Sequence, residues 1–142
     1  MRILLAVDGS KGSLDAVQHV IEHAGWFRST PEVHLVTVHL PVPKLPGMGL
    51  AVGKAQIQRY YDEEGAAKLA AARKRLDAAG VAYRAQVLVG PVAETLVRYA
   101  KDKRCDLIVI GTRGLTAVGK ALIGSTATKV LHLSDTPVLL VK

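Results

Sequence analysis

Hydrophobic and polar positions follow two different spacings along this chain. Short runs such as ILLAV at residues 3–7 are apolar throughout, a pattern typical of a strand that is buried on both faces of a sheet. Longer segments place apolar residues three or four positions apart, as at Leu14, Val17, Ile21 and Ala24, and this spacing predicts an amphipathic helix. The two patterns alternate along the whole chain.

The alternation predicts five strands and four helices. Gly80 stands where a helix would end, and Pro91 suits the first turn of the next helix. Residues 41–53, with three prolines and three glycines, predict a loop long enough to carry function. The predicted strands are residues 3–7, 32–40, 81–89, 106–110 and 137–141, and the predicted helices are residues 10–24, 54–79, 91–101 and 125–133.

Strict alternation of strands and helices predicts an α/β fold. Right-handed crossovers make the strands parallel and put helices on both faces of the sheet, which gives a doubly wound, three-layer sandwich around a five-stranded parallel sheet. The length of 142 residues fits a single domain spanning residues 1–142. A hydrophobic content of 49% fits a well-buried core.

The net charge of +7 raises the question of nucleic-acid binding. The 19 Lys and Arg residues are spread along the chain, and aromatic residues make up 4%, too few to provide stacking platforms for single strands. We therefore expect no nucleic-acid partner, and interpret the charge as a solvated basic surface that can attract anionic ligands.

The amino-terminal segment bears on the location of the protein. Its first apolar run has five residues before Asp8, short of the roughly 7–15 of a secretory signal and the roughly 20 of a membrane span. The single cysteine, Cys105, cannot form a disulfide within the chain. We expect a cytoplasmic protein without a membrane partner.

Polar, glycine-bearing segments follow three of the predicted strands. Asp8-Gly9-Ser10 follows the first, the loop at 41–53 follows the second, and a glycine-rich segment begins at Gly111 after the fourth. Ligands of doubly wound sheets bind beyond the carboxyl ends of the strands, where the strand order reverses. If the first and fourth strands are neighbours, Asp8 and Gly111 face one crevice.

One interpretation of the glycine-rich segment is a Walker A loop. Residues 114–121, GLTAVGKA, have its glycine and lysine spacing and follow a strand. Ala121, however, stands where the motif needs Ser or Thr to bind magnesium, and the last predicted strand ends without an aspartate. The sequence therefore argues against this interpretation.

A second interpretation uses Gly111, Gly114, Gly124 and Ser125, spaced G-x2-G-x9-G-S. The first two glycines permit positive φ and a close approach of the backbone to a ligand, and their N–H groups can point at phosphate oxygens. Gly124 and Ser125 begin a helix whose first N–H groups and dipole favour an anion. Arg113 can place a positive charge near the phosphates or stack on the nucleoside.

This spacing resembles the nucleotide-binding signature of the universal stress protein family. The resemblance covers the whole chain, including the acidic end of the first strand and the Pro-Val of the last one. It implies the adenine nucleotide alpha hydrolase-like fold with strand order 3-2-1-4-5, a nucleotide-responsive regulator that binds ATP with or without magnesium, and a homodimer formed through residues 137–141. The residues that it places around the nucleotide are Val7, Asp8, Val38, Gly111, Arg113, Gly114, Gly124, Ser125 and Thr126.

The sequence also departs from the family pattern and leaves alternatives open. Thr126 stands where the family often has Val. Ala127 stands where the family often has a hydroxyl residue, which removes one potential donor to the γ-phosphate. A slow ATP hydrolase, with magnesium on Asp8 and residues 41–53 as a lid, is one alternative, and an interaction module with a degenerate pocket is another. Gly111 and Gly114 could be turn glycines, and Ser125 and Asp8 could be helix caps.

A pair of histidines raises the possibility of a metal site. His19 and His23 are four residues apart, as zinc ligands on a helix can be. They lie opposite the predicted apolar face of their helix, and no third ligand is evident. A solvated pair is therefore favoured.

Overall fold

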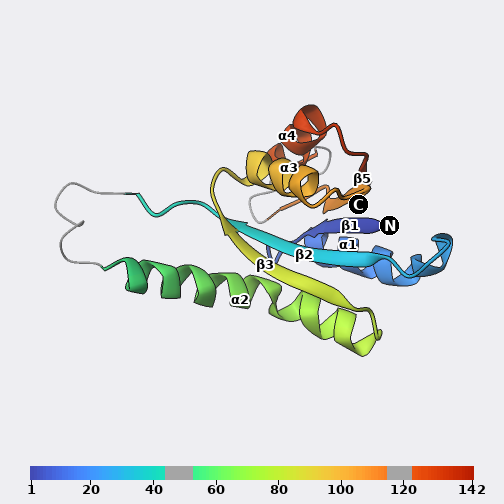
Figure 1. Cartoon of the computed structure of the whole chain (residues 1–142), viewed down its shortest axis with the longest axis horizontal. Helices are drawn as coiled ribbons and strands as arrows, with labels where there is room; N and C mark the ends of the chain where they lie inside the picture. Colours follow the sequence, from blue (N-terminus) through green and yellow to red (C-terminus); the bar gives the residue numbers. More distant parts are fainter. Residues whose placement is uncertain (44–52, 115–122) are drawn as a thin grey trace.

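The computed structural model describes residues 1–43, 53–114 and 123–142 (Figure 1). Strands and helices alternate along the chain as the hydrophobic pattern predicts, with ends shifted by a few residues. The strands are β1 (Arg2–Ala6), β2 (Glu32–His39), β3 (Tyr83–Val89), β4 (Leu107–Gly111) and β5 (Val138–Val141). The helices are α1 (Lys11–Glu22), the short 3-10 turn η1 (Ala24–Trp26), α2 (Lys54–Ala78), α3 (Val92–Asp102) and α4 (Ser125–Leu133).

The strands form one parallel sheet in the order β3-β2-β1-β4-β5. Figure 1 shows α1 and α2 on one face of this sheet and α3 and α4 on the other. The predicted doubly wound fold and the strand order 3-2-1-4-5 are therefore confirmed. The strand order reverses between β1 and β4, so the carboxyl ends of these two strands flank the point where such folds bind ligands.

The central strand β1 is apolar throughout because it serves two cores. Ile3 and Leu5 join the core under α1 and α2, while Leu4 and Ala6 join the core under α3 and α4. Ile3, Leu4 and Leu5 are completely buried. Burial of a side chain of this size contributes about 1.5–3 kcal/mol, so this one strand anchors both helix layers.

The prediction of the buried face of α1 was partly wrong. Leu14 and Ile21 are only partly buried at the edge of the core. The helix approaches β4 closely at Gly12, where a Cβ would overlap the carbonyl of Arg113. The buried residues of α1 are Ser13, Ala16, Val17 and Val20.

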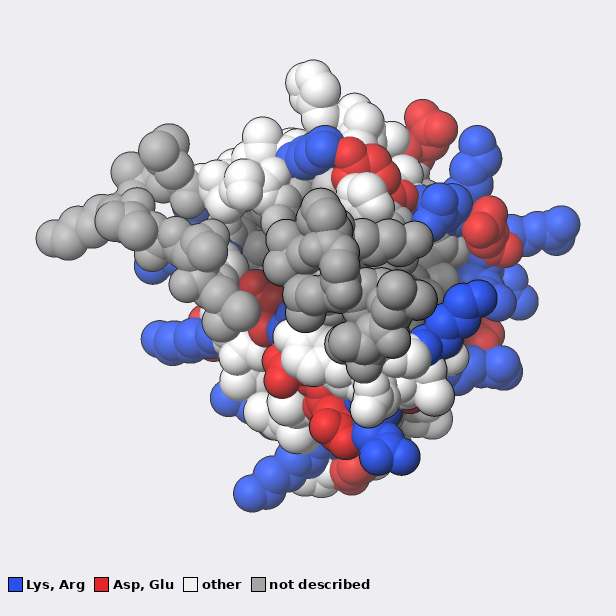
Figure 2. Space-filling view, turned by 90° about the vertical axis from the view of Figure 1, so that its left-hand side faces the viewer, with Lys and Arg blue, Asp and Glu red and all other residues white. Residues whose placement is uncertain are grey.

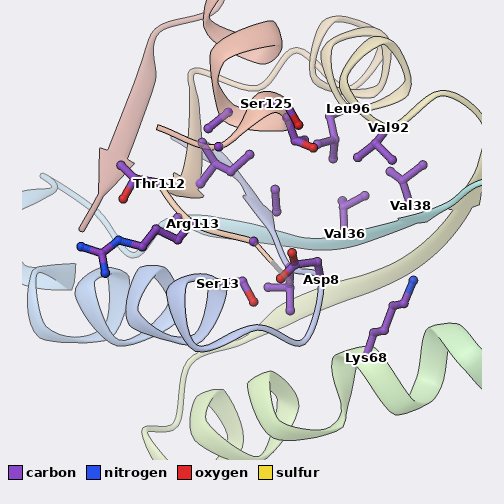
Figure 3. Close-up of a pocket in the computed structure, with 18 of the residues that line it drawn as sticks. Asp8, Ser13, Val36, Val38, Lys68, Val92, Leu96, Thr112, Arg113 and Ser125 are labelled. Atoms are coloured by element: carbon purple, nitrogen blue, oxygen red, sulfur yellow. The ribbon is translucent and has the colours of Figure 1, made fainter. Parts of the chain in front are cut away.

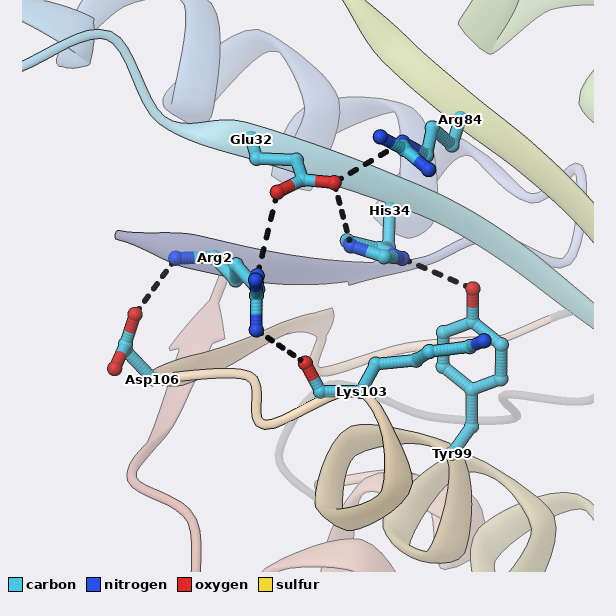
Figure 4. Close-up of polar contacts among 7 residues, drawn as sticks. All are labelled: Arg2, Glu32, His34, Arg84, Tyr99, Lys103 and Asp106. Carbon is cyan, nitrogen blue, oxygen red and sulfur yellow. Dashed lines mark hydrogen bonds and ion pairs between the residues drawn. The ribbon is translucent and has the colours of Figure 1, made fainter.

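A polar network joins the elements at the amino ends of the strands (Figure 4). The carboxylate of Glu32 accepts a hydrogen bond from Arg2 Nε at 3.3 Å and pairs with Arg84 Nε at 3.0 Å. Although desolvation acts to raise it, these cationic neighbours hold the pKa of Glu32 below its usual value. The network links β1, β2 and β3 at the end of the sheet opposite to the one where ligands are expected.

His34 is the buried member of this network. Its Nδ1 lies 2.9 Å from the hydroxyl of Tyr99 on α3, and its Nε2 lies 3.5 Å from Glu32 Oε1. Nε2 makes no hydrogen bond with another described residue. Burial lowers the pKa of His34, and the nearby Arg84 charge acts in the same direction, although the Glu32 carboxylate opposes both. The ring is therefore neutral at neutral pH.

We predict that protonation of His34 destabilises the fold in mild acid. Because the folded-state pKa lies below the ordinary value of 6.5, the stability that His34 contributes is complete above pH 6.5 and is lost as the pH falls through the folded-state pKa. Thermal unfolding measured from pH 7.5 downward should show a steeper loss for the wild type than for His34→Phe. Tyr99 does not add to this trend, because burial raises the pKa of its hydroxyl.

The exposed His132 supplies the matched control. His132→Gln should retain the wild-type pH profile. Parallel profiles for the wild type and His34→Phe would contradict the assignment to His34.

Candidate functional site

A cavity of about 590 Å³ opens beyond the carboxyl ends of β1, β2 and β4 (Figure 3). Residues from the turn after β1, from the end of β2, from α2, α3 and α4, and from the segment after β4 form its walls. The volume lies within the range of small-molecule sites. The nine residues selected from the sequence all line it: Val7, Asp8, Val38, Gly111, Arg113, Gly114, Gly124, Ser125 and Thr126.

Asp8 is held by the turn that follows β1. Its Oδ1 accepts a hydrogen bond from the Ser10 N–H at 2.9 Å, and Gly9 has a φ of +83° that lets the chain turn. Its Oδ2 faces Gly114, where a Cβ would lie 2.9 Å away. Asp8 is therefore not the cap of α1; that cap is Ser10, whose hydroxyl oxygen accepts from the Ser13 N–H at 3.2 Å.

Gly111 serves a backbone contact between α1 and β4. A Cβ on Gly111 would overlap the carbonyl of Gly12, and a Cβ on Gly12 would overlap the carbonyl of Arg113. The positive φ that glycine permits is not used at Gly111 or Gly114. Close approach of backbone requires glycine at 111, whereas the Cβ of a residue at 114 would meet the carboxylate of Asp8. Sequence reasoning missed Gly12, and the small residues Ser10, Gly12 and Ser13 were the available signal.

Thr112 joins the two ends of the glycine-rich segment to the sheet. Its N–H donates to the Val141 carbonyl at 2.8 Å, and its own carbonyl accepts from the Gly124 N–H at 2.6 Å. The start of α4 is thereby fixed beside the end of β4. Gly124 is the N-cap residue of α4 and Ser125 is its first helical residue, so the alternative of Ser125 as the N-cap was wrong.

The first turn of α4 presents backbone donors to the cavity. The first helical hydrogen bond runs from the Thr128 N–H to the Gly124 carbonyl at 3.0 Å. The N–H groups of Ser125, Thr126 and Ala127 bond to no other described residue, and all three residues line the cavity. Such free N–H groups, together with the helix dipole, favour an anion. The methyl group of Ala127 is buried in the core under α4.

Val38 places both its backbone and its side chain at the cavity. The Val36 carbonyl accepts from the Val7 N–H at 2.9 Å, on the β1 side of β2. Backbone groups two residues apart on a strand point to the same side, so those of Val38 also face β1. The pairing of β1 with β2 ends at Ala6 and Val36, and this leaves the backbone of Val38 facing the cavity.

One wall of the cavity is apolar. It is built from β2, β4 and α3, and its side chains are those of Val36, Val92, Leu96 and Ile110. An ion pair between Lys129 and Glu94 joins α4 to α3 beside this wall. A flat apolar group could therefore be buried against this wall while polar groups are bound on the opposite side.

Two cationic residues, Arg113 and Lys68, line the cavity. Arg113 contributes its backbone, since its carbonyl accepts from the Ser10 hydroxyl at 3.3 Å, while its side chain is exposed and points away from Asp8 in Figure 3. Lys68, on α2, was not predicted but lines the cavity. No local motif marks Lys68, because its position depends on how α2 packs.

Some of the sequence hypotheses fall outside the described residues. Lys120 and Ala121 of the Walker A interpretation lie there, as does most of the proposed lid at 41–53. Within residues 1–43, 53–114 and 123–142, no group of three His, Cys, Asp or Glu side chains is arranged to hold a metal ion. No helix among them is long and apolar enough to cross a membrane.

The positive charges are dispersed over the face on which the cavity opens. Figure 2 shows Lys and Arg side chains around the rim of this face with Asp and Glu side chains among them. They do not gather into one stripe in this view.

Comparisons with known proteins agree with this architecture. The family model for the universal stress protein family matches residues 1–142. The universal stress protein MJ0531 of Methanocaldococcus jannaschii is 36% identical over 99% of this chain and 81% of that relative. A universal stress protein solved in complex with cAMP is 27% identical with a TM-score of 0.75, over 100% of this chain and 97% of that one. The Archaeoglobus fulgidus universal stress protein solved in complex with dAMP is 26% identical with a TM-score of 0.62, over 100% and 98%.

The family assignment rests on three findings that agree. They are the strand order 3-2-1-4-5, the glycines between β4 and α4, and the family match along the full length of the chain. This chain belongs to the universal stress protein family.

Proposed function

We propose that this protein binds an adenine nucleotide, ATP in the first instance, and acts as a nucleotide-responsive regulator. The observation that carries the proposal is the convergence, in one cavity, of first-turn N–H groups on α4 that bond to no described residue, the carboxylate of Asp8 and an apolar wall. These groups match the three chemical parts of a nucleotide.

The charges set the direction of the ligand. Phosphates belong at the amino end of α4, where Gly124, Ser125 and Thr126 offer backbone and hydroxyl donors. Asp8 repels phosphate and suits the ribose hydroxyls. The base then lies against the apolar wall, with its edge at the backbone of Val38.

The relatives support an adenine nucleotide. The two solved universal stress proteins described above hold cAMP and dAMP, each of which carries one phosphate. We propose ATP in particular because the glycine spacing resembles the nucleotide-binding signature of the family. Because Ala127 offers no hydroxyl, contact with the γ-phosphate must come from the backbone or from neighbouring hydroxyls.

Calorimetric titration of nucleotide-free protein with ATP, with and without magnesium, tests the proposal. We expect one site per chain and release of ATP from protein denatured after purification without added nucleotide. ADP release is measured in the same samples, because magnesium-dependent release that is lost in Asp8→Ala would indicate the hydrolase alternative. Folded protein that binds no adenine nucleotide would rule out the proposed function.

The two signature glycines should respond differently to alanine. In Gly111→Ala the new methyl group meets backbone, so we expect a loss of about 1–3 kcal/mol in the free energy of unfolding. In Gly114→Ala it meets the movable carboxylate of Asp8, so we expect stability near that of the wild type but ATP binding about tenfold weaker. Chemical denaturation and calorimetry separate the two effects.

Gly25 provides the control for these variants, because a Cβ there would meet no atom within 4 Å. Gly25→Ala should change neither quantity. A Gly114→Ala variant with unchanged affinity would contradict the placement of Asp8 at the ligand.

We also propose a homodimer formed through β5, as the family resemblance implies. β5 lies at an edge of the sheet, and Val138, Leu139 and Leu140 are only half-buried. On the adjoining α4, Leu131 is 50% exposed and Leu133 is 44% exposed. An open apolar edge strand favours aggregation unless it is paired.

A cytoplasmic location stays a prediction from the sequence.

Sedimentation equilibrium at micromolar concentration tests the dimer. We expect the mass of two chains for the wild type and dissociation in Leu139→Lys, which places a charge on the edge strand. A monomeric wild type at this concentration would exclude the proposed dimer.

A further inference from the structure

Lys68 is a cavity residue that no sequence motif singles out. It lies on α2 and lines the cavity together with Asp8 and Val38. Figure 3 shows its side chain rising from α2 toward Val38. The cavity therefore has a cationic side chain on the face that carries α2, across from the amino end of α4.

Packing against the turn after β1 fixes the position of Lys68. A Cβ on Gly9 would lie 3.6 Å from the Cα and carbonyl oxygen of Lys68 and 3.8 Å from its Cγ. Both the backbone of α2 and the stem of the lysine thus lie within van der Waals reach of the turn that carries Asp8. A cation on a packed helix is better preorganised for a ligand than one on a loop.

The charge of Lys68 is not neutralised within the protein. The salt bridges among the described residues involve other side chains, so no described carboxylate lies within 4.0 Å of the Lys68 ammonium group. Residues 44–52 and 115–122 contain no Asp or Glu. Asp8 has one oxygen bonded to the Ser10 N–H and the other facing Gly114.

Contacts between neighbouring residues give the order of the charged groups along the cavity. Gly114 adjoins the Asp8 carboxylate, Asp8 precedes Gly9, and Gly9 packs on Lys68. The turn that carries Asp8 therefore contacts the glycine-rich corner through Gly114 and the backbone and stem of Lys68 through Gly9. A nucleotide with phosphate at the 5′ end alone would leave the ammonium group facing the nucleoside.

We propose that Lys68 is a specificity-determining residue that binds a second phosphate, carried on the ribose. The cavity then favours an adenine nucleotide that carries phosphate at the 5′ position and a further phosphate on the 2′ or 3′ hydroxyl, while Asp8 binds the hydroxyl that remains. The ribose is the attachment point because Lys68 packs on the residue next to Asp8, the group suited to ribose. This inference rests on the proposed nucleotide-binding function and deepens it.

Calorimetry with AMP, adenosine 2′,5′-bisphosphate and adenosine 3′,5′-bisphosphate tests the proposal. We expect the wild type to bind one of the bisphosphates about ten- to a hundredfold more tightly than AMP, the range for one hydrogen bond to a charged group. Lys68→Gln should lose this preference, measured as the ratio of its dissociation constants for AMP and for the bisphosphate. Lys68→Arg, which keeps the charge, should retain it.

Lys74 on the exposed face of α2 provides the matched control, since Lys74→Gln removes the same charge away from the cavity. Its preference should equal that of the wild type, and thermal unfolding verifies that every variant is folded. Binding of AMP without any preference for a bisphosphate, or a preference that survives Lys68→Gln, would overturn the role of Lys68 and leave the proposed function intact. Absence of all adenine nucleotide binding would instead refute the proposed function, and this inference with it.

Discussion

The backbone contact between Gly12 and Gly111 is the constraint on which the site depends. A methyl group on either residue would overlap the chain of the other segment, so α1 and the end of β4 can meet only through glycine. Ser10 reinforces the contact, because its hydroxyl donates to the Arg113 carbonyl at 3.3 Å and accepts from the Ser13 N–H at 3.2 Å. The turn that carries Asp8 is thereby held against the segment that begins the glycine-rich corner.

Two backbone hydrogen bonds of Thr112 hold the glycine-rich corner between β4 and α4. Thr112 bonds to Val141 through its N–H and to Gly124 through its carbonyl, so one peptide segment fixes β5, the end of β4 and the start of α4. The donors of α4 therefore do not depend on a capping side chain for their placement, and Ser125 can direct its hydroxyl to a ligand. A preorganised set of backbone donors costs little reorganisation when an anion binds.

The two ends of the sheet have different polar chemistry, and α3 runs between them. Near its amino end, Val92 and Leu96 form part of the cavity wall. Toward its carboxyl end, Tyr99 contacts His34 in the network that also holds Glu32 and Arg2. The network therefore joins α3 to β1 and β2 at the end of the sheet opposite to the cavity. The ion pair between Lys129 and Glu94 ties the same helix to α4.

The sequence by itself determined the elements and their order, because hydrophobic spacing and glycine or proline punctuation are local properties of the chain. The apolar run at 3–7 required a central strand, and alternation with helices led to the parallel sheet. The spacing of Gly111, Gly114 and Gly124 located the corner in the same way, and Asp8 followed from its place at the end of a strand.

Tertiary structure alone decided what several of these residues do. Gly111 contacts Gly12, Gly114 contacts Asp8, and Lys68 contacts Gly9, and each contact joins segments that are distant along the chain. The outward direction of Arg113 and the small-residue face of α1 also follow from how closely helix and sheet approach. Spacing along a sequence specifies which side of an element a residue occupies, but the distance between packed elements decides whether that side holds a side chain, a backbone contact or a ligand.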